Sequence, residues 1–417
     1  MPHAFAYLFE RFPSFVQTFV YREAIEMVRQ KMEPLLVSVR RPDDPGELAE
    51  RIDADVLYMP EEKELRAEVD ARRAARSLGW RAHRAIPRHR GEPDAQRMFE
   101  AIWLEPVLRA RGVRHVHAHF GGLAARTAWW LRKLFGFTYS YTGHANDIFC
   151  DTDFPITNAD LARRAKFIVT ETDFARRWME QRHPFARGKI HRVFNGIDPA
   201  GFLPREPVGD VPRIVSVGRY VEKKGFDVLI AACAQVRAKG VSFTCDIIGG
   251  GPLQDTLSAQ IEQLALRDYV RLTGPLPQTD IRRQLAASQL FVLACQPERD
   301  GGSDNLPTVI AEAMFAGLPV ISTDLAGIPE MIADGEDGVL IPIRDPAALA
   351  SAILSLLSDP VRALQLAAHG RASALAKFSI EHTARELKHL LIRRARIAPP
   401  TAARALDPAL PRRLWPW

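Results

Sequence analysis

Short apolar runs alternate along this chain with longer stretches in which apolar residues recur every three or four positions. In the first half, strand-like runs occupy 4–9, 35–39, 56–58, 113–118, 139–142, 167–170 and 191–194, and helical stretches occupy 16–31, 61–78, 93–110 and 123–135. Runs of that length are typical of buried strands, and the longer period is that of an amphipathic helix. The alternation predicts a parallel sheet covered by helices.

After Asp198 the pattern is interrupted by PAGFLPREPVGDVP, whose Pro and Gly residues predict a linker. Strands are then expected at 213–217, 243–248, 270–273, 290–294, 319–322 and 339–341, and helices at 226–238, 253–264, 280–287, 308–316, 346–358, 362–376 and 380–396, with a further helix starting near Gly327. A chain of 417 residues favours two domains. We predict two α/β domains, 1–203 and 204–380, with a cleft between them where ligands of such sheets bind.

Composition is that of a globular protein, with 47% hydrophobic and 25% charged residues. We expect no membrane span, because no apolar run reaches about 18 residues, and no secretory signal, because MPHAFAYLFERF lacks a basic start.

Four scattered cysteines suggest buried free thiols in a reducing cytoplasm: Cys150, Cys233, Cys245 and Cys295. A net charge of +6 fits nucleotide phosphates, anionic lipids or nucleic acid. Nucleic acid is disfavoured because no stacking motif accompanies the basic residues.

The segment 298–330 carries two carboxylates, Asp304 and Glu312, around a polar loop and the start of a predicted helix. Backbone N–H groups at that start have no partner within the helix, which suits an anion. These groups belong to Asn305, Leu306 and Thr308. For either carboxylate alone, an ordinary solvated strand–loop–helix is the preferred interpretation.

Asp304 to Glu312, followed by AMFAGLPVIS, resembles the E-x7-E signature of retaining GT-B glycosyltransferases, in particular the GT4 family, with Asp in place of the first Glu. The resemblance implies an α/β GT-B fold, in which two Rossmann-like domains face a central cleft. It also implies that Glu312 binds the ribose of a nucleotide-sugar donor and that Asp304 binds a sugar hydroxyl.

Three glycine-bearing turns in the second half resemble donor-binding segments of the same family. VGRYVEKKG is similar to the motif that holds the donor diphosphate, which assigns that role to Arg219 and Lys224. Fixed cations there stabilise the charge left when the sugar–phosphate bond breaks. IGGGPL implies that Gly249 and Gly251 let the nucleotide approach the backbone, and TGPL implies a main-chain contact of Leu276 with the base.

The first half of the chain contains several histidines that are candidate site residues. His115, His117 and His119 share one face of a predicted strand. We predict no metal site there, because adjacent side chains of one strand seldom converge on an ion alone. The H-x-H-F pattern resembles a GT4 strand end, which makes His119 a candidate cleft residue and His115 a structural one. GHANDIF resembles the loop whose His contacts the donor sugar, a role that falls on His144; Asp147 either orients it, binds an acceptor hydroxyl or favours a turn.

RFPSFVQTFVYRE, at 11–23, is similar to a segment of GT4 enzymes that build exopolysaccharides and O-antigens, and FNGID matches the family turn before the linker. Two D-x-D tripeptides, 53–55 and 151–153, resemble a metal–nucleotide signature of another glycosyltransferase fold, and we assign neither to metal. We therefore expect neither a metal nor a cofactor.

Two basic segments each leave two interpretations open. The arginines of 61–114 form either a solvated helix face or a face toward an anionic membrane; they include Arg72, Arg73, Arg76, Arg81, Arg84, Arg88 and Arg90. Within 381–417 we expect a helix that crosses back to the first domain. The basic aromatic tail after it either packs on the protein or anchors at a membrane interface; it ends in Arg412, Arg413, Leu414, Trp415, Pro416 and Trp417.

Together these features predict a retaining glycosyltransferase that moves a sugar from a nucleotide-sugar, UDP- or GDP-linked, to a saccharide or lipid-linked acceptor in cell-surface polysaccharide or glycolipid biosynthesis. The expected location is cytoplasmic, including the inner face of the plasma membrane. Two alternatives share the fold: a sugar-nucleotide epimerase and a nucleotide-binding protein without catalysis.

Overall fold

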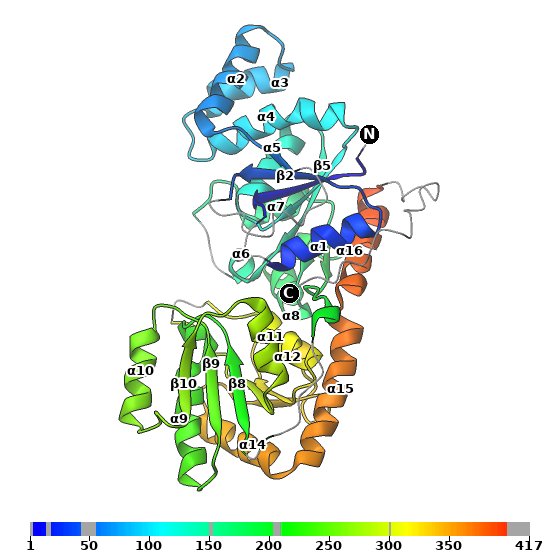
Figure 1. Cartoon of the computed structure of the whole chain (residues 1–417). Helices are drawn as coiled ribbons and strands as arrows, with labels where there is room; N and C mark the ends of the chain where they lie inside the picture. Colours follow the sequence, from blue (N-terminus) through cyan, green and yellow to red (C-terminus); the bar gives the residue numbers. More distant parts are fainter. Residues whose placement is uncertain are drawn as a thin grey trace. The chain divides into compact units, whose positions relative to one another are not determined.

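The computed structural model describes residues 3–13, 18–42, 56–149, 153–202, 209, 211–299 and 302–397. The chain divides into two compact units. Among the described residues, unit 1 comprises those up to Gly196 and those from Thr383 onward, and unit 2 comprises Ile197–His382. Each unit has its own parallel sheet with helices around it (Figure 1).

Unit 1 contains a seven-stranded sheet in the order β3-β2-β1-β4-β5-β6-β7, and every strand pair is parallel. The strands are β1 (Ala6–Arg11), β2 (Leu35–Arg40), β3 (Val56–Tyr58), β4 (His115–His119), β5 (Thr138–Gly143), β6 (Ile168–Thr170) and β7 (Ile190–Arg192). Residues of β1 and β4 are almost wholly buried, as expected of parallel strands covered on both faces.

Nine helices in the described part of the chain contribute residues to unit 1, and all but α16 lie between its strands in the sequence. They are α1 (Thr18–Arg29), α2 (Glu62–Ala74), α3 (Trp80–His89), α4 (Ala95–Ala110), α5 (Leu123–Phe135), α6 (Ala145–Phe149), α7 (Asn158–Arg164), α8 (Asp173–Arg182) and α16 (Ile380–Ala395), with the short η3 (Pro184–Ala186). The last of these helices joins from the far end of the sequence, since Nζ of Lys388 donates to the carbonyl of Gln30 at 2.9 Å.

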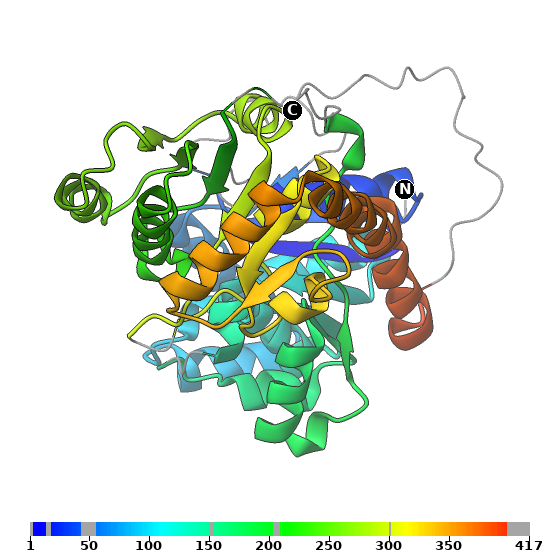
Figure 2. The same ribbon diagram turned by 90° about the horizontal axis from the view of Figure 1, so that it is seen from below.

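Unit 2 contains a six-stranded parallel sheet in the order β10-β9-β8-β11-β12-β13. The strands are β8 (Arg213–Val217), β9 (Thr244–Ile248), β10 (Val270–Gly274), β11 (Leu290–Leu293), β12 (Val320–Thr323) and β13 (Val339–Ile341). The helices are α9 (Phe226–Ala238), α10 (Gln254–Gln263), α11 (Gln278–Ala286), α12 (Thr308–Phe315), α13 (Ile328–Met331), α14 (Pro346–Ser358) and α15 (Pro360–Phe378), with η4 (Pro199–Gly201) and η5 (Glu222–Lys224). Helix α9 packs against α14, and α12 against α15; Figure 2 views the molecule from below, with α14 and α15 in orange.

The predicted strands are confirmed, with ends that shift by at most two residues. The helices α3, α6, α7 and α8 were not predicted; each is only ten residues long or shorter. Two of them have start signals that the pattern passed over: Thr157 and Asp160 form a capping box on α7, and the Thr172 hydroxyl accepts from the Ala175 amide on α8.

The predicted linker begins as ordered structure. Residues 199–201 form η4, and Phe202 stacks on Phe315 with ring centroids 5.6 Å apart, so this part of the linker packs into unit 2. Residues 203–208 and 210 lie outside the described part of the chain. Cys233, Cys245 and Cys295 are buried free thiols, as predicted, and Cys150 is not among the described residues.

Within the described residues, no single helix is both long and apolar enough to cross a membrane. The pair α14 and α15 passes that test only jointly, with a bend of 103° between the two helices.

Candidate functional site

An ion pair in unit 2 joins two of the predicted site residues. Nζ of Lys224 lies 2.6 Å from one carboxylate oxygen of Asp304, and Nζ of the neighbouring Lys223 lies 3.9 Å from the other. The side chains of Lys224 and Asp304 are 14% and 15% exposed, so the pair is shielded but reachable from solvent. Burial lowers the pKa of Lys224, and the Asp304 carboxylate outweighs that effect, so the net pKa is raised. Lys224 is therefore a fixed cation at neutral pH.

The position of Lys224 depends on the glycine after it. Gly225 has a φ of +63°, in the left-handed region that glycine adopts without strain. A Cβ on Gly225 would lie 1.8 Å from the carbonyl oxygen of Ala294, which follows β11. The segment that carries Lys224 thus touches the segment that leads to Asp304, and this close approach brings the two charges together.

Gly249 and Gly251 form the turn after β9, with φ values of +148° and +157°. A Cβ at Gly249 would lie 1.9 Å from the carbonyl oxygen of Gly218, and one at Gly251 would lie 2.8 Å from that of Tyr220. The amide of Tyr220 in turn donates to the carbonyl of Gly250 at 2.9 Å. Backbone packing within unit 2 therefore requires these glycines independently of any contact with a nucleotide.

Glu312 is 6% exposed on α12, and its Oε2 accepts from Nε2 of Gln278 at 3.2 Å. Gln278 begins α11, two residues after the half-buried Leu276. Asn305 and Leu306 are buried before α12, whose first residue is Thr308. Pro307 precedes the helix without a side-chain cap.

The structure thus brings Lys224 and Asp304 into contact and pairs Glu312 with Gln278, while Arg219 lies exposed just after β8. Sequence reasoning passed over Lys223, Gln278 and Cys295, whose Sγ lies 3.6 Å from Asp304. Burial and the Asp304 charge raise the pKa of the Cys295 thiol, which keeps it protonated. Lys223 could have been found from its place beside Lys224; Gln278 and Cys295 carry no comparable local signal.

The predicted residue His144 lies in unit 1, at the carboxyl end of β5, and is 7% exposed. Its Nδ1 lies 2.6 Å from Oε1 of Glu171, which follows β6, and Nδ2 of Asn195 donates to the same oxygen at 2.5 Å. Asp147 accepts from the backbone amide of His144 at 3.1 Å, so the ring is oriented by Glu171 and the loop by Asp147. Sequence reasoning missed Glu171, because its partner is 27 residues away.

A second chain of contacts runs from His144 toward α1. Nε2 of His144 lies 3.4 Å from Nδ1 of His119, and Nε2 of His119 lies 3.0 Å from Oε1 of Glu23. The Tyr7 hydroxyl donates to Glu23 as well. His119 is 1% exposed and stacks on the rings of Tyr7 and Phe9. Glu23 and Tyr7 were not singled out by the sequence.

His115 and His117 bond across to the hydroxyls of β5. His115 contacts Thr138 and Ser140, each at 2.9 Å, and His117 contacts Ser140 at 2.7 Å and Thr142 at 3.0 Å. Burial is the main cause that lowers the pKa of His115, His117 and His119 well below the ordinary value. His115 is structural, as predicted.

A carboxylate from α1 lies beside two of the strand histidines. Donor atoms of Glu23, His117 and His119 lie within 4.8 Å of one another, because α1 supplies a third group beside the strand. Both ring nitrogens of His117 are hydrogen-bonded to hydroxyls. We describe the cluster as a hydrogen-bonded network and assign no metal to it.

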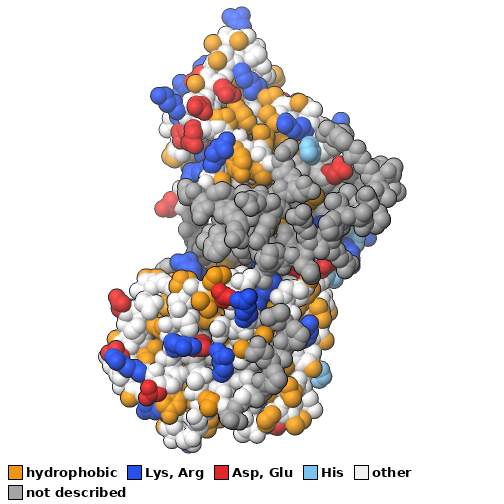
Figure 3. Space-filling model, in the orientation of Figure 1, with side chains coloured by type: hydrophobic (Ala, Val, Ile, Leu, Met, Phe, Trp, Pro, Cys, Tyr) orange, Lys and Arg blue, Asp and Glu red, His pale blue; other side chains and the backbone are white. Residues whose placement is uncertain are grey.

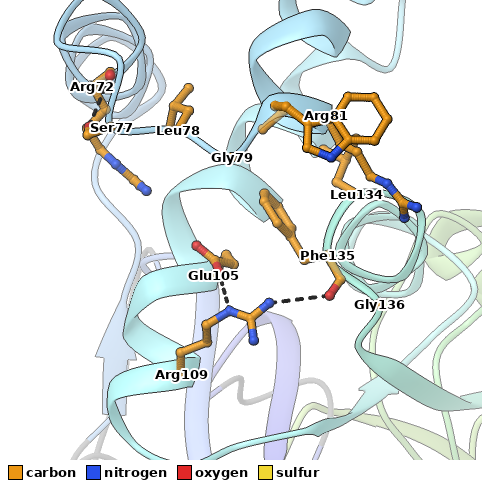
Figure 4. Close-up of a pocket in the computed structure, with 12 residues that line it drawn as sticks. Arg72, Ser77, Leu78, Gly79, Arg81, Glu105, Arg109, Leu134, Phe135 and Gly136 are labelled. Atoms are coloured by element: carbon orange, nitrogen blue, oxygen red, sulfur yellow. Dashed lines mark hydrogen bonds and ion pairs between the residues drawn. The ribbon is translucent and has the colours of Figure 1, made fainter.

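A separate cavity of about 380 Å³ lies in unit 1 beside the α2–α3 turn (Figure 4). Arg72, Arg81 and Arg109 line it, with Trp80 and Phe135. Arg109 is already bonded to Glu105 and to the carbonyl of Phe135, as the dashed lines show. Over this part of unit 1, Lys and Arg side chains lie among hydrophobic and acidic ones (Figure 3).

Two family models match the chain: Glycosyltransferase Family 4 over residues 16–200 and Glycosyl transferases group 1 over residues 211–359. The chain is similar to the amylovoran biosynthesis glycosyltransferase AmsK of Erwinia amylovora, at 35% identity over 50% of this chain and 51% of that protein. It is also similar to the putative colanic acid biosynthesis glycosyltransferase WcaL of Salmonella typhimurium, at 37% identity over 37% of this chain and 39% of that protein. The chain thus spans about half or less of the length of these relatives.

Among solved structures, Anabaena HepE in complex with UDP superposes with a TM-score of 0.69 at 19% identity, covering 93% of this chain and 99% of that one. At that identity the likeness concerns the fold, which is GT-B with its two parallel sheets. The Family 4 match covers most strands of the unit 1 sheet, and the group 1 match covers all strands of the unit 2 sheet. The chain belongs to the group 1 and family 4 glycosyltransferases.

Proposed function

We propose that the protein is a retaining glycosyltransferase that moves a sugar from a nucleotide-sugar to a saccharide or lipid-linked acceptor in cell-surface polysaccharide or glycolipid biosynthesis. The observation that carries the proposal is the ion pair of Lys224 and Asp304 at 2.6 Å, next to the helix that bears Glu312. Family membership and the exopolysaccharide relatives support the same activity.

The proposed chemistry follows from charge. When the bond between the sugar and the diphosphate breaks, negative charge grows on the leaving phosphate, and Lys224 with Arg219 stabilises it. The backbone N–H groups from Asn305 to Thr308 add to this effect. Before the donor arrives, the Asp304 carboxylate balances the charge of Lys224.

The remaining roles concern orientation. Glu312 binds the ribose with one oxygen, while Gln278 holds the other. Asp304 accepts from a sugar hydroxyl, and His144 contacts the donor sugar. Gly249, Gly251 and Leu276 border the nucleotide. No metal or cofactor takes part in this scheme.

One assay distinguishes sugar transfer from the two alternatives, sugar-nucleotide epimerisation and nucleotide binding without catalysis. Purified protein is incubated with UDP- or GDP-sugars, with and without saccharide or lipid-linked acceptors from a polysaccharide-producing bacterium. Nucleotide release that depends on acceptor supports transfer. Interconversion of the sugar without acceptor would indicate an epimerase, and binding without any conversion would indicate a nucleotide-binding protein.

The donor base can be found first by thermal shift with UDP, GDP and ADP. A nucleotide at about 100 times its dissociation constant stabilises the fold by about 2.7 kcal/mol. The nucleotide that raises the melting temperature most identifies the donor series for the transfer assay.

We further propose that the enzyme contacts an anionic membrane through the α2–α3 turn of unit 1, as a lipid-linked acceptor requires. Trp80 is 67% exposed, which is unusual for so large an apolar side chain, and the Arg81 guanidinium lies 5.5 Å from its ring centroid. Arg76, Arg84 and Arg88 are exposed nearby. Exposed Trp with Arg is typical of membrane interfaces. The basic aromatic tail lies outside the described residues.

Vesicle sedimentation tests this contact. The double variant Trp80→Ala/Arg81→Glu should bind anionic vesicles more weakly than the wild type, with a larger difference at low salt. Val361→Ala, which alters an equally exposed residue of unit 2, should bind normally. Equal sedimentation of all three proteins would remove the α2–α3 turn from the proposal.

A further inference from the structure

We propose that Glu23, His119 and His144 share one mobile proton along a buried hydrogen-bonded path, and that Glu171 holds the His144 end of that path in place. The path lies wholly in unit 1 and joins α1 to the carboxyl ends of β4, β5 and β6. Its use in catalysis rests on the proposed function, in which His144 contacts the donor sugar; the path itself does not.

The geometry forms an unbroken line. Glu171 Oε1 lies 2.6 Å from His144 Nδ1, His144 Nε2 lies 3.4 Å from His119 Nδ1, and His119 Nε2 lies 3.0 Å from Glu23 Oε1. Asn195 closes one end by donating to Glu171. Each imidazole therefore connects two different neighbours through its two nitrogens, which is the arrangement a proton relay needs.

Two proton arrangements satisfy every contact on this line. In the first, His144 is protonated on both nitrogens, His119 carries its proton on Nε2, and Glu23 is a carboxylate. In the second, His144 keeps only its Nδ1 proton, His119 carries its proton on Nδ1, and Glu23 is protonated. The His144 Nε2 proton passes to His119 Nδ1 while the His119 Nε2 proton passes to Glu23. The number of protons and the total charge are the same in both arrangements.

Burial and charge support a shared proton. Glu23 is held by Tyr7 and His119, and burial raises its pKa to about 8. Burial lowers the pKa of His144, but the nearby carboxylates, Glu171 first, outweigh this and raise it. Burial thus favours a proton on Glu23 and the carboxylates favour one on His144, whereas burial keeps His119 between them neutral.

Other titratable groups also face the path. Asp147 raises the pKa of His144 from its own loop, and His117 lies beside His119, with ring centroids 5.8 Å apart. Phe19 and Phe120 cover the His144 ring, at 4.9 and 4.5 Å between centroids, and shield it from water. A proton can therefore reach His144 from Glu23 without entering from solvent.

In the proposed reaction, this arrangement makes the charge of His144 respond to the donor. A positive His144 favours an electron-rich oxygen of the sugar diphosphate beside it, and a neutral one favours the positive charge that develops on the sugar. Glu171 and Glu23 are positioning residues here, because they act on the substrate only through His144.

The test is a titration of ¹⁵N-labelled histidines by NMR on the full chain without nucleotide or acceptor. In the wild type, the His144 nitrogens should show two inflections, and the His119 signals should change tautomer in step with them. Glu23→Gln should leave a single inflection and lower the pKa of His144, by about one unit or more for the loss of a nearby carboxylate. Glu171→Gln should also lower it.

Glu26→Gln is the matched control, because Glu26 is also buried on α1 and pairs with Arg29. Its His144 titration should equal that of the wild type. Identical His144 titrations in the wild type and Glu23→Gln would overturn the shared proton. If Glu23→Gln does not fold, the wild-type His119 tautomer decides: a tautomer that stays constant while His144 titrates also overturns it. Because no substrate is present, a failed transfer assay leaves this result unaffected.

Discussion

At the carboxyl edge of the unit 2 sheet, charged side chains lie on turns whose shape glycines determine, whereas at the same edge of unit 1 they are buried among aromatic rings. Lys224 and Asp304 are partly exposed and form a short pair of opposite charges. His119 and His144 are almost fully buried and bond to partners from distant parts of the sequence. Unit 2 thus presents fixed charges to a ligand, while unit 1 holds groups whose charge depends on their neighbours.

The largest effect should come from the glycine turn of unit 2. Gly249→Ala places a Cβ 1.9 Å from the Gly218 carbonyl and in a left-handed conformation, so we expect a loss of unfolding free energy on the order of 4 kcal/mol. Gly274→Ala, with a φ of +78° and open space around it, should cost only about 1 kcal/mol. Urea denaturation measures both. Equal losses of unfolding free energy in the two variants would show that the turn after β9 can move to accommodate the added Cβ.

The ion pair of unit 2 should matter next, for activity. Lys224→Ala should weaken binding of nucleoside diphosphate and lower turnover. Asp304→Ala should leave that binding nearly unchanged and reduce transfer on the order of 100-fold, as expected if a charge-assisted hydrogen bond of about 3 kcal/mol is lost. Steady-state transfer and calorimetry provide the two measurements.

Two further variants sharpen this result. Lys223→Ala is the matched control, because its Nζ lies 3.9 Å from Asp304 instead of 2.6 Å, and its effect should be much smaller. Asp304→Glu restores the usual family residue and should lower activity or shift donor preference if the shorter side chain suits this donor. Loss of nucleotide binding in a folded Asp304→Ala protein would contradict the assigned role.

The stability of the protein should depend on pH through a buried carboxylate of unit 1, Glu100. Burial raises the pKa of Glu100 from 4.5 to about 7, although Arg97 lies 2.7 Å away. The folded state therefore keeps a proton that the unfolded state loses, and stability contributed by this group falls as pH rises from 4.5 to 7. Glu100→Gln cannot titrate, so its stability relative to the wild type should improve by on the order of 3 kcal/mol across that window.

Urea denaturation at several pH values measures this change. Glu62→Gln, at an exposed site on α2, should follow the wild type throughout. A Glu100→Gln protein whose stability differs from the wild type by the same amount at every pH would show that Glu100 stays ionised in the fold.

The smallest expected effect is that of a chelator. Lys224 and Arg219 occupy the proposed leaving-group position, so transfer should continue in excess EDTA. The D-x-D segments at 53–55 and 151–153 fall largely outside the described residues. Activity lost on chelation and restored by Mg²⁺ or Mn²⁺ would contradict the scheme.

Local periodicity was enough to predict both sheets, because buried parallel strands are short apolar runs whatever their partners. It could not find α3, whose ten residues include Pro87 and several arginines. In the candidate site, Lys224 and Asp304 were predictable because each lies in a contiguous motif that resembles those of a known family. Their contact was not, because it depends on Gly225 meeting Ala294, 69 residues further along.

The buried network of unit 1 was the least predictable part. Glu23 and His119 are separated by 96 residues, and Glu171 and His144 by 27. No local pattern links such residues, since their proximity results from strand order and helix placement. Sequence reasoning treated the three histidines of β4 as neighbours on one face, which is correct, but it had no means of adding a carboxylate from α1.

The hydroxyl contacts of His115 and His117 also determine where each ring carries its proton. The Thr138 hydroxyl donates to the carbonyl of Arg114, so it can only accept from Nδ1 of His115. The other nitrogen of His115 then accepts from Ser140, which must in turn accept from Nδ1 of His117. Nε2 of His117 is left to accept from Thr142. One carbonyl at the start of β4 thus gives this row of groups a single direction, and both neutral imidazoles are Nδ1–H tautomers.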